Sequence, residues 1–568
     1  MEILFGRFPH LNELIFSQVD NESLVTCKKV DKTWKKCIDG QKLSWIRMIE
    51  KHIGPLEQST GIWKKVTSKS QVKNVQELAL AVNEFYNRDY RYIDSSHNSW
   101  TDWTPIHIIA ACGKLDLCQF IFDKVTEKNP PNKYGITPLH MAAFSRHLNV
   151  YKLIMGCVSD KNPLDCEGTT PLLIAAERGN FEVCKLIVTH VDDKNHADNV
   201  GHTPLHSAAM EGYFEICEFF LENVHTKNPA DKNGITPLHY AAQEGHLNIC
   251  KLIIDLLDDK NSSDIFGRTP LHYAANAGHF EIIKLIIAHV NDKNPSRNDG
   301  ATPLHIAARK GHLAVCKIII DCLDDKNPSD NEGLTPLHGA AEKGHLEICK
   351  LFFENVCDKN PADNDGDTPI HFAAEEGHLE ICKLFFTHVS DKNPKRNDGG
   401  TPLHRAAQEG HFNVCKLIID FLHDKSPSGI DGLTPLHGAA REAHEICKFF
   451  LENVCNKNPA DSEGTTPLHD ATWGGHLEIC KLFLENVINK NPADNEGYTP
   501  LHIAAQQGHL NVCKLIIENV IVKNPSNDKG ETPLSLATQY SHEKVCKLFT
   551  KRKTLDVNTV QKAKVAKK

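Results

Sequence analysis

The chain has 568 residues, of which 40% are hydrophobic, 7% aromatic and 24% charged, with a formal net charge of −9 at pH 7. These proportions are typical of folded globular proteins and exclude a wholly disordered or collagen-like chain. No apolar run approaches the roughly 18 residues that a membrane span requires, and charged residues interrupt the first residues of the chain. We therefore expect a cytoplasmic protein, with the nucleus as a second location, and no membrane partner.

Residues 1–54 lack the regular period of the later sequence and are predicted to form a small helical domain. Pro9 suits the first turn of a helix whose apolar residues recur at helical spacing, and Ser23 can cap a second helix that runs towards Trp34. A domain of this size buries little apolar surface and needs a partner for its stability. One interpretation is a helical cap that shields the first of the repeats described below.

The run Ser23-Leu24-x-x-Cys27-x-x-Val30-x-x-x-Trp34 resembles the second half of an F-box, and Leu43-Ser-Trp45 is similar to the Leu-Trp that often closes that motif. In the first half, His10 stands where an acidic residue often follows the proline. The resemblance implies that this domain docks on the adaptor subunit of a cullin-type ubiquitin ligase. The implied docking residues are Phe8, Pro9, Leu11, Leu14, Ile15, Phe16, Leu24 and Val30, with Trp34 bracing the helices from within.

Residues 55–100 are predicted to be a helical linker. The stretch from Val75 to Tyr86 has the apolar spacing of an amphipathic helix, which we expect to pack on the first repeat.

Residues 101–550 are predicted to form fourteen repeats. Thr-Pro-Leu-His or a near variant begins at Thr104 and returns every 33 residues, except for one interval of 32 residues that ends at Thr466. In one copy, Thr335 can cap a helix and Gly344 can end it in a left-handed conformation before a second helix follows. The segment from Asp358 to Gly366 is rich in turn formers and predicts a projecting hairpin or loop. One such unit cannot bury its apolar surface alone, so the copies must stack.

The copy that starts at Asp330 closely resembles the ankyrin repeat in its period and its Thr-Pro-Leu-His-x-Ala core. The resemblance implies an all-α fold, a solenoid of helix-turn-helix units with projecting hairpin loops. In ankyrin-like proteins the partner is usually bound by residues beside the loop glycine and by the pair after the two alanines. The partner-binding groove is therefore expected to include Ile136, His202, Ile235, Arg268, Leu334, Asp367, Leu433, Tyr498 and Trp473.

The cysteines and histidines are explained by the repeat. Twelve of the twenty cysteines share one position in the second helix, where two copies carry Tyr151 and Ile283 instead, so reduced thiols in a packed core are expected. Twelve of the 33 histidines lie in Thr-Pro-x-His and eleven lie at the turn between the helices. We expect the first group to hydrogen-bond the adjacent loop and the second group to pack at the corner between helices. No copy has the close paired spacings of zinc modules, so neither a metal nor a cofactor is expected.

Two copies depart from the pattern. The copy that begins at Thr434 has Ala443 at the turn glycine and lacks the leucine that usually follows, which predicts that the array bends or opens first at residues 440–446. The last copy has Ser535 in place of the first histidine and is expected to be a terminal cap. Residues 551–568 hold seven basic side chains and one acidic side chain and are expected to be a disordered tail.

Charge and motifs limit the possible functions. Residues 1–100 carry a net charge of +3 and the tail +6, which leaves −18 for the repeats. Such an array disfavours nucleic acid and favours basic partner segments. The sequence has no glycine-rich phosphate loop, no nucleophile elbow and no Ser, His and Asp set outside the repeated positions, so no enzyme is expected. We expect a substrate receptor of a ubiquitin ligase that binds an unknown substrate protein on the array. The alternative is an ankyrin scaffold or adaptor without a ubiquitin role.

Overall fold

The computed structural model describes residues 104–122, 125–442 and 445–550. The predicted domain at 1–54, the predicted linker at 55–100 and the predicted tail at 551–568 lie outside these residues. All regular secondary structure in the described residues is helical, which confirms the all-α prediction. These residues divide into two compact units between Ile265 and Phe266. Unit 1 and unit 2 denote the described residues before and after that point.

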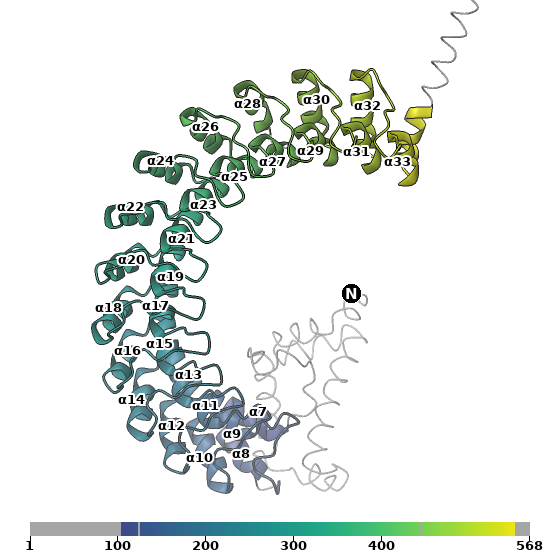
Figure 1. The fold of residues 1–568 in the computed structure, drawn as a ribbon. Helices are drawn as coiled ribbons and strands as arrows, with labels where there is room; N and C mark the ends of the chain where they lie inside the picture. The colour runs from purple at the N-terminus through teal and green to yellow at the C-terminus, as the bar shows by residue number, and fades with distance from the viewer. Residues whose placement is uncertain (1–103, 123–124, 443–444, 551–568) are drawn as a thin grey trace, which may run out of the picture. The chain divides into compact units, whose positions relative to one another are not determined.

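Unit 1 contains five repeats, each with two antiparallel helices. Labels follow Figure 1. The first helices are α7 (Pro105–Cys112), α9 (Pro138–Phe144), α11 (Pro171–Glu177), α13 (Pro204–Glu211) and α15 (Pro237–Glu244), and the second helices are α8 (Leu115–Phe122), α10 (Leu148–Cys157), α12 (Phe181–Val188), α14 (Phe214–Asn223) and α16 (Leu247–Ile254).

Unit 2 continues the same pattern through nine first helices. These are α17 (Pro270–Ala277), α19 (Pro303–Lys310), α21 (Pro336–Glu342), α23 (Pro369–Glu375), α25 (Pro402–Gln408), α27 (Pro435–Arg441), α29 (Pro467–Trp473), α31 (Pro500–Gln507) and α33 (Pro533–Gln539). The second helices are α18 (Phe280–His289), α20 (Leu313–Ile320), α22 (Leu346–Asn355), α24 (Leu379–His388), α26 (Phe412–Phe421), α28 (Ile446–Asn453), α30 (Leu477–Asn486) and α32 (Leu510–Asn519), and residues 543–550 are also helical.

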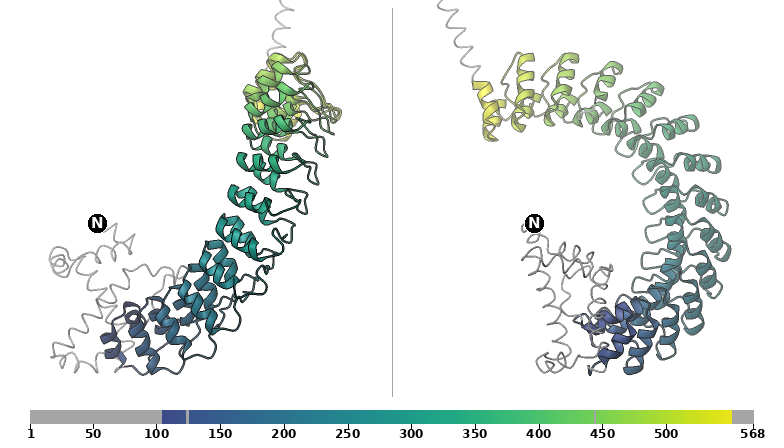
Figure 2. Two further views of the ribbon diagram at one scale, coloured as in Figure 1. Left: turned by 90° about the vertical axis from the view of Figure 1, so that its left-hand side faces the viewer. Right: turned by 180° about the vertical axis from the view of Figure 1, so that it is seen from behind.

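Each unit consists of two layers of helices. Within a unit, every first helix packs against the first helix of the next repeat, and the second helices form a parallel layer behind them. The core lies between the layers, where Leu337, Ala341 and Cys349 are completely buried. Figures 1 and 2 show that the loops of unit 2 project from the side of the first helices. We call the loops and first helices of unit 2 the loop face.

The helix ends form as the sequence predicts. Thr335 caps α21 in an extended conformation, and Pro336 occupies the first turn. Proline has no N–H, and an N–H in the first turn has no intrahelical acceptor, so no hydrogen bond is lost. Gly344 has φ of 80°, in the left-handed region. A Cβ added to Gly344 would lie 2.7 Å from Cε1 of His378, so close packing as well as backbone conformation requires glycine here.

The recurring Asp-Lys-Asn-Pro segment connects two helices through side-chain contacts that the sequence analysis did not predict. Nζ of Lys359 donates to the carbonyls of Phe353 and Val356, at 2.7 and 3.1 Å, at the end of α22. Oδ1 of Asn360 accepts the N–H of Ile370 at the beginning of α23, at 3.3 Å. The segment therefore satisfies polar backbone groups at both helix termini, in addition to forming the turn.

The shared cysteine position belongs to the packed core. Cys349 is completely buried and burial raises the pKa of its thiol to about 12. Tyr151, at the same position, is also completely buried, and its hydroxyl donates to the carbonyl of Lys161 at 3.0 Å. All cysteines of the described residues are free thiols.

The repeat that follows α26 has lost contacts that its neighbours retain. Ser426 replaces the asparagine that accepts a helix N–H, as Asn393 does from Leu403 at 3.0 Å. Gly429 replaces the loop residue that is aspartate in most copies, and Ile430, which is 72% exposed, replaces the loop asparagine. The turn at residues 443–444 lies outside the described residues, so the predicted opening at residues 440–446 stays a prediction. The lost contacts at 426–430 favour first opening in this same copy.

Candidate partner-binding face

The first histidine of each repeat supports the loop face. The N–H of Thr335 donates to Nδ1 of His338 at 3.0 Å, so Nδ1 is unprotonated and the ring proton lies on Nε2. Nε2 then donates to the carbonyl of Asp367 in the next loop, at 3.2 Å. His338 is 2% exposed, and burial lowers its pKa to about 4. The histidine is therefore neutral at pH 7 and joins its own helix cap to the neighbouring repeat.

The same bridge recurs in both units and confirms the predicted role of these histidines. It joins His107 to Ile136, His140 to Thr169, His206 to Ile235, His272 to Ala301, His305 to Leu334, His404 to Leu433, His437 to Thr465, His469 to Tyr498 and His502 to Glu531.

The turn histidines join repeats as well as packing at the helix corner. The ring of His378 lies against Gly344 of the preceding repeat, and its Nε2 hydrogen-bonds the carbonyl of Glu342 at 3.0 Å. The predicted packing role is confirmed, and the inter-repeat hydrogen bond is an addition that the sequence analysis missed.

Each loop is held internally and by its neighbour. Oδ1 of Asp363 accepts the N–H groups of Asp365 and Asp367, at 3.0 and 2.8 Å. The backbone N–H of Asn364 donates to the carbonyl of Glu332 in the preceding loop at 3.0 Å, and Nδ2 of Asn364 donates to the carbonyl of Asn331 at 3.0 Å. The loops therefore form a rigid series.

The structure places most of the predicted groove residues at the base of the loops. Histidine bridges reach the backbone carbonyls of six of them, Ile136, Ile235, Leu334, Asp367, Leu433 and Tyr498. The side chains are half-buried at Ile136, His202, Ile235, Arg268, Leu334, Leu433 and Tyr498 and buried at Asp367. Trp473, at the end of α29, is 60% exposed. Whether these residues bind a partner stays a prediction.

Several of these side chains already have partners within the chain. The guanidinium of Arg268 lies 4.9 and 5.1 Å from the ring centroids of Phe266 and Tyr273. The hydroxyl of Tyr498 donates to Glu531 at 2.8 Å. These contacts fix the orientation of the two side chains on the loop face.

In unit 1, His202 belongs to a polar cluster. Its Nε2 lies 2.9 Å from the hydroxyl of Tyr240 and 3.4 Å from Oδ2 of Asp231, and its ring stacks on His206 with centroids 5.6 Å apart. Burial raises the pKa of Tyr240. The cluster presents two hydrogen-bonding rings at the loop base.

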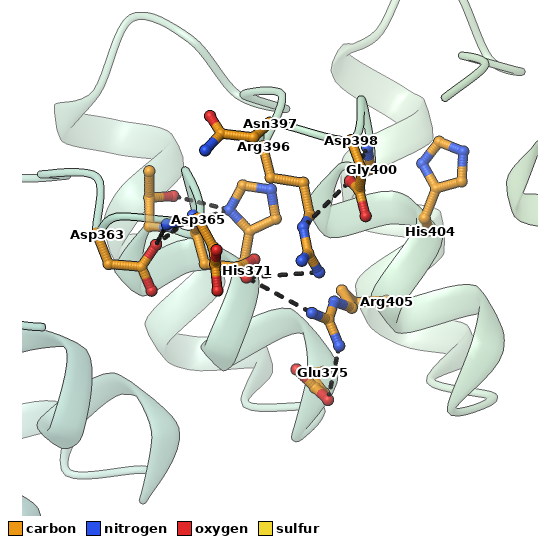
Figure 3. Close-up of polar contacts among 12 residues, drawn as sticks. Asp363, Asp365, His371, Glu375, Arg396, Asn397, Asp398, Gly400, His404 and Arg405 are labelled. Carbon is orange, nitrogen blue, oxygen red and sulfur yellow. Dashed lines mark hydrogen bonds and ion pairs between the residues drawn. The ribbon is translucent and has the colours of Figure 1, made fainter. Parts of the chain in front are cut away.

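A charged cluster of the loop face includes Glu375, Arg396 and Arg405 (Figure 3). Nη1 of Arg396 and Nη2 of Arg405 approach Oδ2 of Asp367 at 3.4 and 3.5 Å, and Arg405 also donates to Glu375 at 3.1 Å. Burial raises the pKa of Asp367, and the two guanidinium groups oppose that rise.

Three buried polar atoms in this cluster, Oδ1 of Asp367, Nε2 of His371 and Nε of Arg396, lack hydrogen-bond partners among the described residues, although Nε of Arg396 forms an ion pair with Asp398 at 3.1 Å. Oδ1 of Asp367 has no donor, although Asp367 is only 7% exposed. Nε2 of His371 lacks the bridge that most of the corresponding histidines form to the next loop.

A second buried carboxylate lies further along the first helices. Asp470, in α29, is 6% exposed, and its Oδ1 accepts from Nη2 of Arg441 at 2.8 Å. Its Oδ2 has no partner among the described residues. Burial raises the pKa of Asp470 to about 6, against the opposing effect of Arg441.

The position directly before the loop glycine belongs to the positions expected to bind a partner, although its residues were not named individually. It lies two positions before the expected groove residues, and in seven consecutive copies from Asp299 to Glu496 it is acidic and exposed. The signal was present in the sequence as one repeat position that keeps its charge while the groove positions vary.

Neither a metal centre nor a membrane span is found in the described ranges. No group of three or more His, Cys, Asp or Glu side chains within these ranges has the geometry of a metal site. Within the same ranges, no helix has both the length and the apolar character needed to cross a bilayer.

Comparison with known proteins identifies the repeat. A family model described as ankyrin repeats in three copies matches residues 71–165, 150–231, 223–297, 285–363, 337–428, 403–494 and 485–561. The match begins inside the segment that the sequence analysis assigned to a linker. No curated protein matched the chain, and no enzyme family was found. The family match covers most of the sequence and agrees with the paired helices and the histidine bridges, and we conclude that the chain belongs to the ankyrin-repeat family.

Proposed function

We propose that the chain is a protein-interaction module that binds a partner protein on the loop face of unit 2. Ankyrin repeats typically act as non-catalytic binding modules. The observation that carries the proposal is the contrast between a recurring support and a variable surface. The same bridges, made by His338 and His404 among others, hold most of the loops, while the side chains at Leu334, Asp367 and Leu433 differ.

The exposed indole of Trp473 gives this surface an anchor. Large aromatic side chains dominate the binding energy of many protein interfaces because they bury a large area with little loss of conformational entropy. Trp473 is 60% exposed at the end of α29, although the core of the same repeat is completely buried.

Site-specific photo-crosslinking tests the proposal. A photoreactive phenylalanine analogue is placed at Leu433 or Trp473 on the loop face, and at Lys481 or Lys514 on the second helices as matched exposed controls. We expect identifiable protein adducts from the loop-face positions and few from the controls. Equal adducts from both sides would contradict the assignment of the binding surface.

We further propose that the partner is a substrate and that residues 8–34 recruit a cullin-type ubiquitin ligase. The support is the F-box resemblance of the sequence, which lies outside the described residues. In this proposal Phe8, Pro9, Leu24 and Val30 belong to the docking face for the ligase adaptor. The alternative, an ankyrin scaffold without a ubiquitin role, needs only the loop face.

Adaptor binding separates these two functions. The full chain is tested for capture of the ligase adaptor, together with a Leu24→Asp, Val30→Asp variant and an Ile488→Asp, Ile521→Asp control. Ile488 and Ile521 are fully exposed, so the control adds the same charges without disturbing a core. The ligase proposal predicts capture by the native chain and the control only. A native chain that captures no adaptor would leave the scaffold as the function.

A further inference from the structure

Exposed apolar side chains lie at the ends of two neighbouring second helices in unit 2. Ile488 and Ile521 follow α30 and α32 at the same repeat position, and their side chains are 101% and 97% exposed. Val522, next to Ile521 in the chain, is 61% exposed. Because α30 packs against α32, the two isoleucines belong to one surface and lie about 10 Å apart. We call Ile488, Ile521 and Val522 the terminal apolar row.

The apolar character of this row is not a general property of the repeat. Every earlier copy in the described residues has a polar residue or a cysteine where Ile488 and Ile521 stand, among them Asp192, Asp258 and Asp324. Single exposed apolar side chains are common on protein surfaces, whereas a contiguous group of them marks a surface that another segment covers. The terminal apolar row is such a group, and it is confined to the two copies before the last.

Val522 occupies a position where a polar side chain normally supports the turn. In the preceding copy, Oδ1 of Asn489 accepts the N–H of Asn491 at 3.3 Å. Valine has no side-chain acceptor, so the corresponding N–H of Asn524 lacks this bond. An exposed apolar side chain therefore replaces a hydrogen bond here, which is an observation independent of the exposure of the isoleucines.

The end of α32 also lacks a lysine contact that other second helices have. Nζ of Lys490 donates to the carbonyl of Leu484 near the end of α30, at 2.6 Å. Lys523, at the same position after α32, is exposed and forms no such bond within the described residues. The carbonyl end of a helix carries a partial negative charge, and the exposed carboxylate of Glu485 adds to it. This surface therefore favours a segment that combines apolar and basic side chains.

The register of the repeat brings residues 551–568 to this surface. Thr550, the described residue directly before them, corresponds to Ile517 in α32, so the chain leaves the described residues beside the end of that helix. Ile488 lies two copies back, a distance of about 20 Å at the usual spacing of packed helices. Ten residues of extended chain span about 33 Å. Residues 551–560 are therefore long enough to turn back and reach across the whole row.

We propose that residues 551–560 fold back onto the terminal apolar row and cover it. Leu555, Val557 and Val560 supply the apolar contacts, and the basic run at 551–553 lies at the carbonyl end of α32. Docking is favourable because the hydrophobic free energy scales with the apolar area removed from water. This ordered contact differs from the disorder that the composition of the tail predicts. The inference is independent of the partner-binding function proposed above.

Hydroxyl-radical footprinting of the full chain tests the inference, because the rate of oxidation of a side chain depends on its exposure to solvent. The apolar-tail variant carries Leu555→Ser, Val557→Ser and Val560→Ser. The control variant carries the same number of serines at polar tail positions, through Thr554→Ser, Asn558→Ser and Thr559→Ser. Neither variant changes the charge of the tail. Ile430, which is 72% exposed in a loop of unit 2, is the internal reference.

We expect Ile488 and Ile521 to be oxidised at least about threefold faster in the apolar-tail variant than in the native chain or the control variant. Unchanged oxidation of Ile430 would show that the array is intact. Equal oxidation of the two isoleucines in all three chains, or equal acceleration in both variants, would overturn the inference. Protection that increases with protein concentration would also overturn it, because the occupant would then be a second copy of the chain.

The reciprocal variant changes the row and measures the effect on the tail. Ile488→Ser, Ile521→Ser and Val522→Asn introduce residues that other copies carry at these positions. Trypsin should then cleave within 551–553 at least about threefold faster than in the native chain, whereas Ile430→Ser should leave that rate unchanged. A cleavage rate that is the same in the row variant and the native chain would contradict the docking.

Discussion

Neutral histidine is the residue on which the contacts between repeats depend. His338 accepts a proton on Nδ1 only by losing the bond from Thr335, so protonation and folding compete. The pKa is 6.5 in the unfolded chain and about 4 in the fold. The fold binds fewer protons than the unfolded chain in this range. The stabilisation is therefore present above pH 6.5 and is lost as the pH falls to about 4.

This competition predicts a sensitivity to acid that can be removed one histidine at a time. The repeat at Thr170 carries Leu173 at the histidine position, which makes His338→Leu a substitution that the fold already contains. We expect the variant to lose about 1–2 kcal/mol at pH 7 through the missing hydrogen bonds. Between pH 7 and pH 4 the free energy of unfolding falls for both chains. The fall should be about 3 kcal/mol smaller in the variant than in the native chain. Urea unfolding at several pH values measures both effects, and parallel curves would contradict the titration argument.

For Asp470 we expect the opposite dependence of stability on pH. Its pKa rises from 3.8 to about 6 on folding, so the fold binds more protons than the unfolded chain between these values. Stability from this residue is therefore lost as the pH rises, by up to about 3 kcal/mol. Asp470→Asn should remove that loss, so the stability of the variant relative to the native chain should increase from pH 4 to pH 7. A difference that is independent of pH would show that Asp470 is ionised normally.

At the residue scale, the sequence predicted the roles that depend on backbone preference. Thr335, Pro336 and Gly344 follow from helix capping and the left-handed conformation. The roles of Lys359 and Asn360 were missed, because turn composition does not show which backbone groups a side chain reaches.

At the scale of a helix, glycine has opposite effects in two places of unit 1. Gly179 has φ of 68° and an added Cβ would lie 2.5 Å from Cε1 of Tyr213. Gly156 lies within α10, where an added Cβ meets nothing within 4 Å. We expect Gly179→Ala to lower stability by about 1–2 kcal/mol and Gly156→Ala to raise it by about 1 kcal/mol. Thermal unfolding of the two variants provides the comparison, and changes of the same sign would exclude the conformational explanation.

The repeat after α26 is expected to be the first part of unit 2 to open. Ser426→Asn, Gly429→Asp and Ile430→Asn restore the residues of the neighbouring copies. Gly429 is outside the left-handed region, so aspartate fits its backbone. The restored hydrogen bonds should stabilise this copy by about 2 kcal/mol and slow hydrogen exchange at 426–454.

The reverse changes in the next copy are the matched control for this prediction. Asn458→Ser, Asp461→Gly and Ser462→Ile remove the bonds that Asn458 and Asp461 make to helix and loop N–H groups. Exchange should become faster there. Uniform exchange across both copies in the native chain would contradict the weak-copy hypothesis.

At the scale of the whole molecule, the thiols form two populations that reflect the layered fold. Cys157, Cys166, Cys322, Cys357 and Cys455 are exposed, whereas eleven of the twelve cysteines at the shared helix position are buried. Burial raises the pKa of Cys349 to about 12, so its thiolate is scarce at neutral pH. Brief alkylation of the native chain should modify the five exposed cysteines and leave the eleven buried cysteines unmodified until denaturant is added. Mass spectrometry of the peptides measures this pattern, and early modification of the buried set would indicate an open core.

The division into two units is the feature of the whole molecule that the sequence did not predict. The 33-residue period runs through Ile265 and Phe266 without a change in length. Period and composition identify the copies that stack, but they do not mark a boundary between compact groups of copies. The family and the helical layers could therefore be predicted, whereas the boundary between the two units required the coordinates.

The histidine bridges also bear on how such a chain changes length during evolution. One copy has 32 residues, yet His437 still reaches the carbonyl of Thr465 at 3.2 Å and His476 still reaches that of Arg441 at 2.8 Å. The deletion falls after Glu442, between the two acceptor carbonyls, those of Arg441 and Thr465. Most copies carry the same donor histidine and the same acceptor carbonyl, so a duplicated or excised copy can form matching bonds with its new neighbours. The gene can thus gain or lose whole recognition loops without a new interface having to evolve.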